Sequence, residues 1–87
     1  MQVEILGARL KYDEQQGYVG QVRFAVKGHK QPYEMTLQSD EGSEWSYSLL
    51  FLNESGDENE IIAVEEEIDR NDELFERLVA AAQESLE

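Results

Sequence analysis

Apolar and polar residues alternate along four segments of this chain, and that alternation restricts it to a fold rich in strands. In YVGQVRFAVK, for example, Val22, Phe24 and Val26 alternate with less apolar neighbours. A period of two is typical of a strand with one face on a core and the other in water. The pattern predicts four strands, at about residues 2–12, 18–27, 33–38 and 45–52. Short, turn-rich connections separate them, so we expect antiparallel neighbours arranged in sequence order.

The first of these segments changes phase in its middle. Val3 and Ile5 fall on one face, whereas Leu6 and the alternate apolar residues after it fall on the other. A slip of one residue moves every later side chain to the opposite face. We therefore predict a β-bulge at Leu6–Gly7, with glycine there because bulges often need a positive φ.

The segment EIIAVEEEI, which follows the fourth strand, fits two kinds of structure. Ile61, Ile62 and Val64 are β-branched and follow a turn rich in Gly and Asn, which favours a fifth strand over residues 60–67. Ile61, Val64 and Ile68 also have helical spacing, so a helix that begins here is the alternative. We adopt the strand because β-branched residues prefer sheets.

From Asp69 onward the period becomes that of an amphipathic helix, predicted over about residues 71–86. The apolar stripe of this helix consists of Leu74, Phe75, Leu78, Val79, Ala82 and Leu86. We therefore expect a single α+β domain over residues 1–87, a five-stranded antiparallel meander packed against one C-terminal amphipathic helix. The expected core includes Val22, Phe24, Val26, Met35, Leu37, Leu49, Phe51, Leu74, Phe75 and Leu78.

The chain is strongly acidic, with a net charge of -13, and the charge is unevenly placed. Residues 1–30 contain five Lys or Arg and three acidic residues, whereas residues 31–87 contain two and 17. Such a surface repels nucleic-acid phosphates and anionic lipid, so we expect neither nucleic acid nor a membrane as a direct partner. A basic protein would instead be attracted. Solubility, or a host with a high-salt cytoplasm, explains the acidity without any partner.

The composition also excludes several kinds of site. The chain has no cysteine, so it forms no disulfide, thiolate nucleophile or Cys-type zinc site. No apolar run approaches the roughly 20 residues of a membrane-spanning helix, and the first residues lack the layout of a signal peptide. We therefore expect a cytoplasmic protein.

Motifs for catalysis and for metal binding are missing as well. The only histidine, His29, lies in a turn, where we expect it to be solvated and without the orienting partner that a general base needs. The acidic loop NESGDENE alternates oxygen-bearing side chains. However, its glycine is fourth rather than sixth and its expected flanks are strands, so it does not fit an EF-hand. We expect no enzymatic activity, no cofactor and no metal site.

The fourth strand and the loop after it combine apolar and acidic residues, and we predict the protein-binding site there. Because one helix covers only one face of a sheet, apolar side chains on the other face would be exposed, which is typical of an interaction surface. The candidate binding residues are Trp45, Tyr47, Leu50, Leu52, Glu54, Asp57, Glu58 and Glu60. Two alternatives stay open: Trp45 and Tyr47 belong to the core, or the bulged first strand folds over the second face.

Together these features favour a small acidic accessory or regulatory protein that acts by binding another protein and is not an enzyme. We expect a monomer or a weak homodimer. One alternative is a self-assembling structural module. The other is an inhibitor that mimics nucleic acid in order to bind a basic DNA- or RNA-binding protein.

One stretch of the sequence supports the alternative of a nucleic-acid-mimicking inhibitor. From Met35 to Ile61, Ser-Asp is followed by an aromatic residue, an apolar strand and an Asn-rich acidic turn. This order resembles the strand–turn–strand part of the phage uracil-DNA glycosylase inhibitors, and the resemblance implies nucleic-acid mimicry. It covers under a third of the chain, which lacks that family's acidic N-terminal helical segment, so we assign no family from it.

Overall fold

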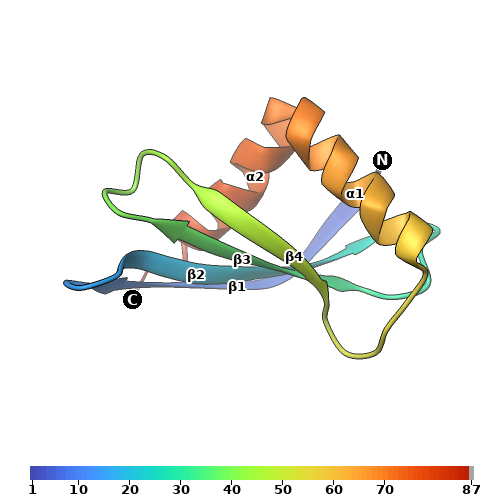
Figure 1. Ribbon diagram of the computed structural model, residues 1–87, viewed down its shortest axis with the longest axis horizontal. Coiled ribbons are helices and arrows are strands. Elements are labelled where there is room, and N and C mark those ends of the chain that lie inside the picture. The colour runs from blue at the N-terminus through green and yellow to red at the C-terminus, as the bar shows by residue number, and fades with distance from the viewer. Residues whose placement is uncertain (87) are drawn as a thin grey trace.

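The computed structural model describes residues 1–86 and has two layers, an antiparallel sheet and a pair of helices. The strands are β1 (Val3–Asp13), β2 (Gly17–Val26), β3 (Tyr33–Ser39) and β4 (Ser46–Phe51), in the spatial order β1-β2-β3-β4. The helices are α1 (Glu58–Arg70) and α2 (Asp72–Gln83). Figure 1 shows both helices over the same face of the sheet. The fold is therefore α+β, with one face of the sheet covered by helices and the other open.

The prediction of a fifth strand over residues 60–67 was wrong, because these residues belong to α1. Asp57 caps α1, since its side chain accepts a hydrogen bond from the Asn59 N–H at 2.8 Å. Val64 and Ile68 are then buried on one face of the helix. The cap and the buried face outweigh the preference of β-branched residues for sheets. The fold has four strands and two helices in place of the expected five strands and one helix.

Asn71 alone separates the two helices. Its backbone is extended (φ -115°, ψ 91°). Its N–H donates to the Glu67 carbonyl, and this is the last backbone hydrogen bond at the C-terminal end of α1. Its side-chain oxygen accepts from the Leu74 N–H at 3.2 Å and so caps α2. Its side-chain amide donates to Glu67 Oε2 at 3.0 Å. This bond, with a second from Arg70, lowers the pKa of Glu67. One residue therefore sets the angle between α1 and α2.

The predicted bulge in β1 is confirmed. The register between β1 and β2 shifts between Ile5 and Gly7, so Leu6 is an extra residue that is half exposed. Gly7 does not have the positive φ that we expected. Instead it lies under the Arg23 side chain, and a Cβ at Gly7 would stand only 2.7 Å from Arg23 Nη2. This contact is with the end of an exposed, flexible side chain, so neither backbone conformation nor close approach requires glycine at this position.

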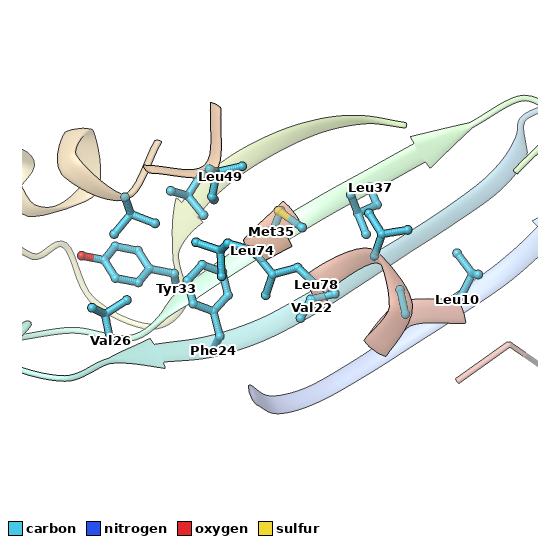
Figure 2. Close-up of a cluster of buried hydrophobic side chains, with 14 residues drawn as sticks. Leu10, Val22, Phe24, Val26, Tyr33, Met35, Leu37, Leu49, Leu74 and Leu78 are labelled. Atoms are coloured by element: carbon cyan, nitrogen blue, oxygen red, sulfur yellow. The ribbon is translucent and has the colours of Figure 1, made fainter. Parts of the chain in front are cut away.

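The core lies between the helices and the covered face of the sheet (Figure 2). Eight of the ten expected core residues are buried, whereas Phe51 and Phe75 are only partly buried at its margin. The core also includes Tyr33 and Leu10 from the sheet and Ile68 from α1. Within residues 1–86, no helix is both long enough and apolar enough to cross a membrane.

Candidate functional site

β4 is one edge of the sheet, and half of its backbone groups have no partner strand. The Leu52 N–H donates to the Pro32 carbonyl, toward β3. Because N–H and C=O groups alternate in direction along a strand, those of Tyr47, Leu49 and Phe51 point away from β3. Within the described residues no strand pairs with that side of β4. Three N–H groups and three carbonyls are therefore available to a further strand.

The residues of β4 do little to block such pairing. Its sequence, SYSLLF, contains no charged residue and no proline, and its pairing with β3 is regular. Natural proteins usually protect an exposed edge strand with charged residues, with proline or with a β-bulge. Leu50 lies on the open face of the sheet and is 58% exposed. β1 pairs on the far side of β2 and leaves that face open, so the alternative in which β1 folds over it is excluded.

One side of α1 stands above the free edge of β4. Four exposed residues are spaced four, three and four apart along α1 and so share one side of the helix. They are Glu58, Ile62, Glu65 and Asp69, and we call them the acidic flank. The Tyr47 hydroxyl donates to Asp69 Oδ1 at 2.7 Å, which places the flank on the β4 side of the helix layer.

Tyr47 connects this flank to the sheet. Its ring lies 5.7 Å from that of Phe75, and its pKa is raised by burial, by the hydrogen bond to Asp69 and by the charges of Asp69 and Glu65. The hydroxyl therefore stays protonated at neutral pH and remains a donor to the carboxylate. This contact joins the end of α1 to the start of β4, beside the core packing of Val64 and Ile68.

The predicted binding residues do not form one surface. Trp45 lies near Tyr18 at the start of β4, and Leu52 is half-buried after its end. Asp57 caps α1, and Glu60 accepts a hydrogen bond from the Lys30 N–H at 3.0 Å.

The β4 edge contains Tyr47 and Leu50, and the acidic flank contains Glu58. Glu54 is exposed in the loop between β4 and α1. Glu65 and Asp69 were not among the predicted binding residues, and Ile62 was expected only as an exposed apolar residue of a fifth strand. Their spacing is visible only when the segment is treated as a helix.

His29 is not the solvated residue that we expected. Its Nδ1 lies 2.7 Å from the hydroxyl of Tyr33, whose ring is buried. Burial, followed by the charges of Glu60 and Asp57, raises the pKa of Tyr33 to about 12. The Lys30–Glu60 hydrogen bond joins the same turn to α1. These contacts hold the β2–β3 turn against the first turns of α1, which is a structural role.

Among residues 1–86, no three His, Asp or Glu side chains converge closely enough to hold a metal ion. The acidic residues are instead spread over the surface of the helices and turns, with Glu65 and Asp69 on one side of α1 and Glu67 directed to Asn71.

Comparison with protein-family models, with curated proteins and with solved structures gave no match to this chain.

Proposed function

We propose that this protein is a non-enzymatic binding module that accepts an extended basic segment of a partner protein as an additional strand beside β4. The observation that supports it is an uncharged, unpaired edge strand directly below a row of carboxylates. Strand addition uses backbone hydrogen bonds for affinity and alternate side chains for specificity. The free backbone groups of Tyr47, Leu49 and Phe51 would supply the hydrogen bonds, and the acidic flank would supply the specificity.

The geometry suits lysine or arginine at every second position of the partner segment. An added strand lies about 4.8 Å from β4, and its alternate side chains point toward the helix layer. Basic side chains there meet Glu65 and Asp69, while their aliphatic stems lie against the exposed Ile62. On the other face, apolar side chains of the segment would cover Leu50.

The charge of the chain favours a basic partner over a second copy. Two copies paired through β4 would bring together two acidic flanks on chains that each carry a net charge of -13. Like charges so placed repel, whereas a basic segment is attracted and steered to the edge. The self-assembling alternative therefore requires that salt screen this repulsion.

Amide hydrogen exchange tests strand addition directly. We would mix ¹⁵N-labelled protein with an octapeptide of alternating lysine and valine. We expect slower exchange at the amides of Tyr47, Leu49 and Phe51, which gain acceptors, and no change at Ser48 and Leu50, which already bond to β3. The control peptides replace lysine by glutamate or carry N-methyl groups on every backbone nitrogen, and neither should protect these amides.

Two variants with the same change of charge separate the acidic flank from the general acidity. Glu65→Gln should weaken binding of the lysine–valine peptide several-fold, whereas Glu76→Gln, on an exposed position of α2, should leave it nearly unchanged. Equal weakening by both variants, or binding that leaves the three β4 amides unprotected, would contradict the proposal. Protection of these amides in the protein alone at high salt would favour self-assembly instead.

A further inference from the structure

A concave feature lies at the opposite end of the helix layer from the start of α1. Beyond the last turn of α2, a hollow of about 230 Å³ opens on the covered side of the sheet. It begins where the buried core ends at Leu10 (Figure 2). Its lining consists of Leu10, Tyr18, Glu41, Gly42, Trp45, Gln83 and Leu86, which we call the aromatic hollow. It is separate from the free edge of β4, because its walls come mainly from β1, β2, the β3–β4 turn and the end of α2.

The walls of the hollow are aromatic and apolar. The ring of Tyr18 lies 6.2 Å from that of Trp45 and 5.0 Å from that of Tyr12, and the Tyr12 side chain is 56% exposed. On the other side, Leu86 pairs with Leu10 in an isolated bridge and keeps half of its side-chain surface exposed. Tyr18 and Trp45, which line the hollow, are themselves half-buried, so part of each ring and half of Leu86 remain accessible to a side chain from outside.

The β3–β4 turn, which closes one side of the hollow, is preorganised. Gly42 has a φ of 85°, which only glycine adopts readily, and a Cβ there would lie 3.1 Å from the Tyr18 ring. The Gly42 N–H donates to the buried Ser39 hydroxyl at 2.8 Å. The turn is thus held over Tyr18 without a ligand.

The charge at the hollow has one sign. Among residues 1–86, Glu41 is the one charged residue of the lining, and the nearby positions Asp40, Glu44 and Glu84 add further carboxylates. A cation above an aromatic ring is attracted by its negative face, and arginine is the side chain that most often does this. The volume lies below the range of about 300–1,000 Å³ that is usual for small-molecule pockets, but above a cavity of about 150 Å³ that holds benzene.

We propose that the aromatic hollow binds a single arginine side chain of a protein partner. The guanidinium lies over Trp45 and pairs with Glu41, while its methylene stem contacts Leu10 and Leu86. This uses the two parts of arginine, an apolar stem and a planar cation, against the two kinds of wall. The hollow does not depend on strand addition at β4, and each of the two sites can be tested when the other fails.

The single tryptophan of the chain reports on this hollow. We would follow the indole N–H resonance of Trp45 and the amide of Gly42 during titration with the blocked tripeptide Gly-Arg-Gly. Matched tripeptides would carry citrulline, which keeps the shape without the charge, or norleucine, which keeps only the apolar stem. We expect a saturable shift with arginine, at millimolar concentration and weakened by salt, and binding at least several-fold weaker with the other two.

Charge-matched variants complete the test. Glu41→Gln should weaken arginine binding several-fold, whereas Glu76→Gln should not change it; both positions are exposed, so neither change disturbs the core. Equal binding of citrulline or norleucine, or no effect of Glu41→Gln, would overturn the proposal. The tripeptide should leave the exchange of the Tyr47, Leu49 and Phe51 amides unchanged, so a failure here is distinct from a failure of strand addition.

Discussion

The two edges of the sheet are built differently. β1 has a bulge at Leu6, charged residues along its length and a bridge from Leu10 to Leu86, and its Val3 carbonyl accepts a hydrogen bond from Arg77 at 3.0 Å. β4 has none of these features. The difference shows that the fold protects one edge with the same devices that natural sheets commonly use and leaves the other open. If a partner segment adds to this edge as proposed, the carboxylates beside it would favour basic segments over acidic ones.

The largest expected effect comes from comparing a leucine buried between the helices and the sheet with a leucine on the open face of the sheet. Leu78→Ala removes a fully buried side chain of α2, the helix that packs on β1 and β2, and should lower the free energy of unfolding by about 2–5 kcal/mol. Leu50→Ala, on the open face of β4, should change it by less than about 0.5 kcal/mol. Urea denaturation measures both, and equal losses would mean that Leu50 is packed as tightly as Leu78.

Asn71→Ala should have the next largest effect, because Asn71 joins the helix above β4 to the helix above β1. The loss of its cap costs about 0.5–2 kcal/mol. Asn59→Ala, on an exposed position of α1, is the control and should cost less.

The loss in Asn71→Ala should also depend on pH. Asn71 and Arg70 lower the pKa of Glu67, so their stabilisation is complete above the ordinary glutamate pKa and disappears as the pH falls through the lowered one. Denaturation at neutral and acidic pH checks this, and a loss that grew on acidification would contradict it.

Arg77→Ala reopens part of the protected edge. The Val3 carbonyl loses its donor but gains water, so the free energy of unfolding should fall by about 1 kcal/mol or less. Exchange at neighbouring amides of β1 should quicken, while that of Leu49 in β4 stays the same. Arg9→Ala, on an exposed position of the same strand, is the control.

The smallest expected effect on stability comes from giving β4 the protection that β1 has. Ser48→Lys places a cation on the exposed edge strand and should change the free energy of unfolding by less than about 0.5 kcal/mol. It should nevertheless weaken binding of the lysine–valine peptide, because Ser48 shares the open face with Leu50, and a cation there would stand where the valine side chains of the added strand pack. Ser48→Thr is the neutral control, and unchanged peptide binding by Ser48→Lys would count against strand addition at this edge.

The antiparallel sheet and its bulge could be read from the sequence, because alternation and its change of phase are local features. The segment from Ile61 to Ile68 could not be assigned to a strand or to a helix from local features alone. Its β-branched residues favour a strand, and its spacing suits a helix. The decision depends on the Asp57 cap and on burial of Val64 against the sheet, and burial is a tertiary effect.

The candidate site was predicted in part for the same reason. β4 itself is recognisable from its aromatic and apolar residues. The acidic flank exists only if the segment is helical, and its place above β4 depends on a contact between Tyr47 and Asp69, 22 residues apart. The aromatic hollow likewise brings Tyr18, Trp45 and Leu86 together from three distant parts of the chain.

The contact between Arg77 and Val3 also has a consequence for how the protein folds. The strands form hairpins between neighbours in sequence, whereas this contact joins residues 74 positions apart. Closing so long a loop costs more chain entropy than closing a hairpin, and such contacts tend to form late. We expect Arg77→Ala to speed unfolding and to leave the folding rate nearly unchanged. The edge that is protected in the native state would thus acquire part of its protection last, after the four strands have paired.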